Sequence, residues 1–120
     1  MYDHIGLHVK DLKASVRFYE ATLGALGYVL CSQDATGAGL GPKGEPALWL
    51  YADKGTKAPG VHIAFRARNR AAVDTFHKDG VKAGGGDHGK PGLRADYSPT
   101  YYAAFLTDPD GNNVEAVCLA

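Results

Sequence analysis

Alternating apolar and polar positions open the chain and predict a strand over residues 3–9. The apolar positions Ile5, Leu7 and Val9 share one side of that strand, and His4 points to the other side. Asp11 is a good cap for a following helix that extends to about residue 26, where glycines end it. Further apolar runs predict strands over residues 28–32, 36–40 and 47–51.

The second half of the chain repeats this order of elements. A strand over residues 61–67 leads into a helix that Asn69 caps and that Gly80 is expected to stop. Strands are predicted near residues 82–85, at 101–107 and at 113–118, with a strong turn over residues 108–111 between the last two. Each half therefore consists of a strand, a helix and three more strands.

The sequence itself supports an internal repeat. At an offset of 58 residues, His4 aligns with His62 and Phe18 aligns with Phe76. A second repeated segment aligns Pro42 with Pro109 at an offset of 67. The sequence therefore predicts one α+β domain over residues 1–120, composed of two modules at about 1–57 and about 58–120.

Composition narrows the class of protein. Thirteen basic and 13 acidic residues balance to a net charge of zero, which argues against a nucleic-acid binder or an anionic-membrane binder. No apolar run is long enough for a membrane span, and no apolar signal core follows the N-terminus. Cys31 and Cys118 do not form a C-x-x-C pair, and free thiols are typical of a reducing compartment. We expect a cytoplasmic protein.

Three side chains point to metal chemistry. His4 and His62 lie at repeat-related strand positions and project away from the predicted core. Glu115 interrupts an apolar strand, where a carboxylate is costly unless it is paired, protonated or bound to a metal. Two histidines and one carboxylate suit a divalent cation and leave coordination positions open. The same spacing also fits ordinary surface histidines and a glutamate on a solvated edge strand.

A glycine-rich connection over residues 84–100 is long for a compact domain, which is typical of a functional or mobile loop. We interpret it as a rim over the metal, where Lys90 and Arg94 would contact an anionic substrate. Tyr101 and Phe105 share a strand face and would line the pocket. The alternative is a solvated loop with ordinary charges.

Several segments resemble the vicinal oxygen chelate superfamily, which includes glyoxalases, bleomycin-resistance proteins and extradiol dioxygenases. The segments that carry the likeness are His4, Asp11-Leu12, Phe18-Tyr19, Gly60-Val61-His62-Ile63-Ala64 and the run from Phe105 through Asp108-Pro109-Asp110-Gly111 to Glu115. The resemblance implies two βαβββ modules whose curved mixed sheets form a cup around a metal. It also implies that His4, His62 and Glu115 are the ligands.

Departures from the family bear on the reaction. Glyoxalase I-like members have a fourth ligand on the last strand of the first module, and the corresponding position here is Leu48 or Leu50. Three ligands resemble the manganese-dependent fosfomycin-resistance thiol transferases and the iron-dependent extradiol dioxygenases. The run around Trp49 is similar to the former, so the resemblance implies that Trp49 contacts substrate and that a thiol is a cosubstrate. Gly6 and Phe105, however, stand where the resistance enzymes have threonine and tyrosine.

The resulting hypothesis is a metalloenzyme that binds two vicinal oxygens of a small substrate on one divalent ion, Mn, Fe, Zn or Ni. Lyase, thiol transferase and dioxygenase chemistry all stay open, and no general base is assigned. We expect a homodimer whose site lies within one chain or is shared between two. The alternatives are a metal-free small-molecule binding protein of the bleomycin-resistance type and a ligand-sensing domain.

Overall fold

A computed structural model describes residues 1–54 and 60–120 of the chain. It contains two helices and two four-stranded sheets, and it confirms the predicted α+β fold of two βαβββ modules. The elements in chain order are β1 (Ile5–Val9), α1 (Leu12–Ala25), β2 (Val29–Gln33), β3 (Gly37–Gly41), β4 (Leu48–Ala52), β5 (His62–Arg66), α2 (Arg70–Lys82), β6 (Gly86–Leu93), β7 (Tyr102–Thr107) and β8 (Asn113–Cys118).

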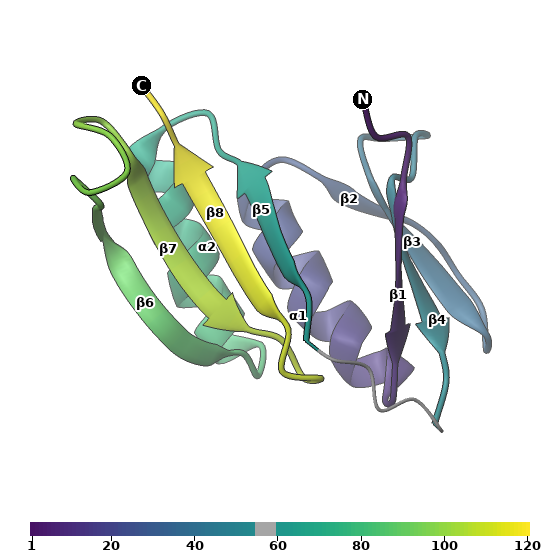
Figure 1. The fold of residues 1–120 in the computed structure, drawn as a ribbon. Helices are drawn as coiled ribbons and strands as arrows, with labels where there is room; N and C mark the ends of the chain where they lie inside the picture. Colours follow the sequence, from purple (N-terminus) through teal and green to yellow (C-terminus); the bar gives the residue numbers. More distant parts are fainter. Residues whose placement is uncertain (55–59) are drawn as a thin grey trace.

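The two sheets have the same topology. Their strand orders are β1-β4-β3-β2 and β5-β8-β7-β6, and in each sheet the first and last strands of the module pair in parallel. The other pairs are antiparallel, so both sheets are mixed. β1 and β5 are edge strands, and β5 is the strand of its sheet that lies nearest to the other sheet (Figure 1).

Both helices begin where the sequence predicts. The Asp11 side chain accepts a hydrogen bond from the Ala14 amide, and the Asn69 side chain accepts one from the Ala72 amide. Such caps satisfy amide groups that have no partner inside the helix. α1 packs against α2, and the two helices cover one face of each sheet, so both modules contribute to a single core (Figure 1).

Two expectations about the second module are wrong. Gly80 does not stop α2, which continues to Lys82, and the strand predicted at residues 82–85 is instead the end of this helix and the turn after it. Gly80 is buried where a Cβ atom would overlap the side chains of Leu106 and Thr22, so this glycine lets α2 approach both β7 and α1. The residue is needed for packing rather than for a helix end.

The predicted rim loop is also shorter than expected. About half of residues 84–100 form β6, which pairs with β7 through two register shifts, between Asp87 and Gly89 and between Gly89 and Gly92. β6 is an edge strand, and an edge tolerates the missing amide of Pro91 as well as bulges. Only the segment from Arg94 to Tyr101 connects β6 to β7.

The turn between β7 and β8 joins the two modules. Asp108 is buried, and its carboxylate accepts hydrogen bonds from the amides of Asp110 and Asn112 and from the Asn112 side chain. It also accepts a 2.6 Å hydrogen bond from the hydroxyl of Tyr19 in α1. In the described parts of the chain, neither helix is long and apolar enough to cross a membrane.

Candidate functional site

The side chains that suggest chemistry lie on the sheet faces turned away from the helices. In the second sheet, Val114, Ala116 and Cys118 point into the core, so Glu115 and Val117 point to the opposite face. β5 places His62 beside this face, and β7 places Phe105 directly across from Glu115 in the ladder. We refer to this surface as the open face of the second sheet.

His62 and Glu115 are in direct contact on that face. Nε2 of His62 lies 3.0 Å from Oε1 of Glu115, and Nδ1 of His62 lies 3.2 Å from the carbonyl oxygen of Asn113. The carbonyl can only accept, so the Nδ1 atom carries a proton and donates it. Nε2 and Oε1 then face each other as lone-pair atoms unless a proton or a cation lies between them. This donor set, one imidazole and one carboxylate, fits a divalent transition metal.

Tyr101 occupies the other oxygen of the same carboxylate. Its hydroxyl donates a short hydrogen bond to Oε2 of Glu115. Burial of the phenol and this hydrogen bond raise the pKa of Tyr101 to about 12. Glu115 is only 3% exposed. Among the described residues, its two oxygens have one protein partner each, His62 at Oε1 and Tyr101 at Oε2. The substrate contact predicted for Tyr101 stays a prediction. In the structure, the hydroxyl of Tyr101 contacts Glu115, the candidate metal ligand.

The other predicted substrate contacts of the second module lie around Phe105. The Phe105 ring stacks near His62, with ring centroids 6.4 Å apart and planes inclined by 25°. The Arg94 guanidinium lies 5.4 Å from the centre of the Phe105 ring and donates a 2.7 Å hydrogen bond to the carbonyl oxygen of Lys90. Arg94 therefore lies at the border of the open face, while Lys90 is exposed on β6.

The open face of the first sheet is aromatic. Trp49 and Tyr51 share this face, and they lie over Gly39 and Gly6, where Cβ atoms would come within 2.8 Å and 2.7 Å of their rings. His8 also lies here, with its ring 5.6 Å from that of Tyr51. The glycines leave space for the rings to lie close to the sheet.

The ladder corrects the expected counterpart of Glu115. Gly6 pairs with Trp49, and the repeat-related Ala64 pairs with Glu115, so Trp49 is the equivalent of Glu115. Leu48 and Leu50, expected to take that position, are buried in the core on the helix side. The conclusion that this position carries no fourth carboxylate is unchanged, because it is a tryptophan.

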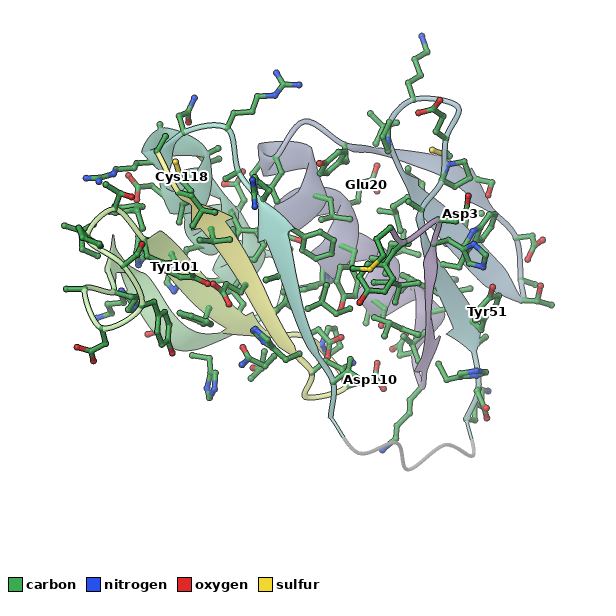
Figure 2. All side chains as sticks on the ribbon, turned by 45° about the horizontal axis from the view of Figure 1, so that its top comes forward. Asp3, Glu20, Tyr51, Tyr101, Asp110 and Cys118 are labelled. Atoms are coloured by element: carbon green, nitrogen blue, oxygen red, sulfur yellow. The ribbon has the colours of Figure 1, made fainter. Side chains whose placement is uncertain are left out.

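His4 lies apart from the other two predicted ligands. It precedes β1, its side chain is about half exposed, and its Nδ1 atom lies 2.7 Å from the carboxylate of Asp3. Figure 2 shows Asp3 beside β1, far from Tyr101 on the other sheet. Within residues 1–54 and 60–120 of one chain, no three His, Cys, Asp or Glu side chains are grouped to hold a metal ion. The three-ligand site stays a prediction.

An apolar cavity of about 280 Å³ lies next to His4 rather than beside Glu115. It is lined by side chains of both modules, among them Leu23, Tyr28 and Phe65. The cavity lies between the first sheet and β5. Sequence analysis did not anticipate it, because it depends on how the two modules pack.

Other features of the site were missed as well. The Asn113 carbonyl that orients His62 belongs to the backbone, so residue type carried no signal for it. Tyr51 and His8 alternate with core positions on their strands, and that alternation could have placed them on the open face with Trp49.

Comparisons with known proteins agree with this geometry. The family model described as the Glyoxalase/Bleomycin resistance protein/Dioxygenase superfamily matches residues 2–116. No protein of curated function matches the chain. A solved glyoxalase/bleomycin resistance protein from Albidiferax ferrireducens T118 is 30% identical, with 98% of each chain covered and a TM-score of 0.85.

Two more distant structures share the fold. A glyoxalase/bleomycin resistance protein/dioxygenase family enzyme from Burkholderia phytofirmans PsJN is 18% identical, with 98% of each chain covered and a TM-score of 0.76. Lactoylglutathione lyase from Agrobacterium tumefaciens is 20% identical over 96% of this chain and 90% of its own, with a TM-score of 0.65.

Proposed function

Because the chain belongs to the glyoxalase/bleomycin resistance protein/dioxygenase superfamily, we propose that it is a metal-dependent enzyme that acts on a small molecule through two adjacent oxygen atoms. The observation that carries this proposal is the contact between His62 and Glu115, because a buried carboxylate and an oriented imidazole nitrogen meet on an open face. His62 and Glu115 would hold one divalent ion, Mn, Fe, Zn or Ni. The bound ion would supply Lewis-acid stabilisation of oxyanion charge.

The third ligand in this proposal is His4 from a second copy of the chain. β1 and β5 are edge strands, each paired on one side only in the described parts of the chain, and exposed strand edges favour pairing with another chain. His4 precedes β1 and His62 begins β5, so joining β1 of one copy to β5 of another would bring these histidines close together. A homodimer of this kind contains two equivalent sites.

The protein residues would have separate tasks around the substrate. The open face of the second sheet would bind the end of the substrate that carries the two oxygen atoms. Phe105 would make an apolar contact there, and Arg94 and Lys90 would lie near negative charge on the substrate. Trp49 would contact the apolar body of the substrate from the partner's sheet. A lyase with four protein ligands is disfavoured, because Trp49 stands at the counterpart of Glu115. A thiol cosubstrate belongs to this proposal only for the transferase reaction.

Metal content tests the ligand assignment. Wild-type protein purified without chelator is expected to carry about one divalent ion per chain, and His4→Ala, His62→Ala and Glu115→Ala are expected to lose it. His88→Ala is the matched control, because His88 is an exposed histidine on β6 with no contact to His62 or Glu115 found among the described residues. Absence of metal from wild-type protein after loading with Mn, Fe, Ni and Zn would overturn the proposal.

Mixing two inactive variants tests whether the site is shared. In a shared site, a mixed dimer of His4→Ala and Glu115→Ala has one site with both changes and one intact site. Random exchange of equal amounts should therefore restore about a quarter of the wild-type metal sites. A site within one chain would give no recovery. Screening the restored sites for isomerisation, thiol transfer and ring cleavage would identify the reaction.

A metal-free binding protein is the second candidate. It is favoured by one observation: Glu115 already accepts a hydrogen bond from Tyr101, and a proton on Nε2 of His62 would supply a second donor, so the carboxylate would be satisfied without a cation. Under this function, the wild-type protein would bind no metal and Glu115→Gln would leave small-molecule binding intact.

A further inference from the structure

The two oxygens of Glu115 have different surroundings, and this difference sets how the carboxylate can bind a cation. Oε1 lies 3.0 Å from Nε2 of His62 on the open face. Oε2 accepts the hydroxyl hydrogen of Tyr101. Glu115 is in the middle of β8, between Ala64 and Phe105, and is only 3% exposed, so its side chain has little space in which to turn.

Tyr101 is held in place independently of Glu115. Its carbonyl oxygen accepts a 2.8 Å hydrogen bond from the Arg94 amide, and the Arg94 carbonyl accepts one of 2.9 Å from the Tyr97 amide. The Tyr97 ring packs against the Tyr101 ring edge-to-face, with centroids 5.0 Å apart. The short connection from β6 to β7 therefore presents the Tyr101 hydroxyl from a fixed support.

We propose that Tyr101 is a positioning residue that occupies one oxygen of Glu115, so that a cation at His62 is bound by the other oxygen alone. This inference rests on the proposed metal function. A carboxylate that binds through one oxygen uses one coordination position, whereas binding through both oxygens would use two. Tyr101 thereby keeps a position available for the second oxygen of the substrate.

The next residue in the chain offers a matched control. The Tyr102 hydroxyl donates a 2.6 Å hydrogen bond to the carboxylate of Asp74 in α2, and its ring lies 5.1 Å from the Arg70 guanidinium. Tyr101 and Tyr102 thus each bond a carboxylate, but they lie on opposite faces of the second sheet. Replacing either tyrosine with phenylalanine removes one hydroxyl and leaves the ring.

The experiment measures Mn²⁺ binding to wild-type protein, Tyr101→Phe and Tyr102→Phe, using the electron paramagnetic resonance signal of free Mn²⁺. Tyr101→Phe is expected to weaken binding by about 10- to 100-fold, the usual loss when a partner of a metal ligand is removed. Tyr102→Phe is expected to stay within about twofold of wild type, since Asp74 is not a ligand. Thermal unfolding of the metal-free proteins should show that both variants stay folded, with a larger decrease in Tm for Tyr101→Phe because Glu115 is buried and Asp74 is exposed.

Each other outcome has a distinct meaning. Wild-type affinity in Tyr101→Phe overturns the positioning role and leaves the proposed function standing. Equal weakening in both variants also overturns the role, because it would reflect a general loss of structure. A wild-type protein that binds none of Mn²⁺, Fe²⁺, Ni²⁺ and Zn²⁺ overturns the inference together with the proposed function.

Discussion

The open faces of the two sheets differ most at one equivalent rung of the repeat. In the first sheet this rung is Gly6, Trp49 and Gly39, so an aromatic ring lies between two glycines. In the second sheet it is Ala64, Glu115 and Phe105, so a carboxylate takes the central position. The strand order and the position of the helix after the first strand are the same in both modules.

This difference shows how a repeated scaffold can divide its tasks. The second sheet supplies ionisable groups in contact with one another, His62 and Glu115, with a tyrosine on the carboxylate. The first sheet supplies flat apolar rings, with the glycines beneath them leaving the necessary space. The candidate ligands are divided between the modules, with His4 before β1 and with His62 and Glu115 on β5 and β8. No three such side chains are grouped within the described residues of one chain, which is why the proposed site draws on two copies.

The two modules also differ in how their turns are anchored, and the largest expected effect on stability follows from that. Asp108 is buried and ties the second module to Tyr19 of α1. Asp34, before β3, is exposed, and within the described residues it accepts hydrogen bonds from nearby Thr36 and Gly37 alone. Asp108→Ala is expected to cost about 3 kcal/mol, because a hydroxyl and several amides lose their acceptor.

Thermal unfolding measures this difference. For a chain of this size, Asp108→Ala should lower Tm by roughly 10 °C, and Asp34→Ala should lower it far less. Equal decreases for the two variants would show that the contact between modules adds nothing to stability. Tyr19→Phe removes only the partner hydroxyl and should give an intermediate decrease.

A smaller effect is expected from the glycine beneath Trp49. A Cβ atom on Gly39 would lie 2.8 Å from Cζ3 and 2.9 Å from Cη2 of the Trp49 ring, so the ring would have to move. Gly39→Ala is expected to cost about 1–2 kcal/mol, the usual range for overpacking. Denaturant unfolding measures this loss. Phenylalanine lacks both of these atoms, so the same change in a Trp49→Phe background should cost less, with the 3.0 Å contact to Cβ of Pro46 remaining. An equal cost in both backgrounds would contradict the close fit.

Local signals in the sequence predicted much of the fold. The caps at Asp11 and Asn69 and the alternation along β1, β5 and β8 are confirmed, because hydrogen bonding within one turn and side-chain alternation depend on nearby residues. Gly80 shows the limit of such signals. Its place in the helix depends on Leu106 and Thr22, which are distant in sequence.

The predicted counterpart of Glu115 was wrong because of strand register. The repeat that aligns Pro42 with Pro109 has an offset of 67 residues, whereas the ladder relates Trp49 to Glu115 at an offset of 66. A shift of one residue moves every side chain to the other face. The position of His4 relative to His62 depends on how the edge strands β1 and β5 meet, and the alternation of side chains carries no information about that contact.

The smallest expected effect compares one carboxylate from each module in acid. Hydrogen bonds from the side chain and backbone amide of Thr36 lower the pKa of Asp34, and a hydrogen bond from His77 is the main cause that lowers the pKa of Asp87. Lowered pKa values contribute stability that is present above the unfolded value of about 4 and is lost as pH falls below it. Asp34→Asn and Asp87→Asn should therefore each make Tm fall less steeply than in wild type as pH drops below about 4.

The charges of His77 and Lys90 also act on Asp87, whereas only neutral donors lower the pKa of Asp34. Added salt at about 1 M should consequently reduce the effect of Asp87→Asn and leave that of Asp34→Asn unchanged. Equal salt sensitivity would show that the two modules hold their carboxylates by the same interaction.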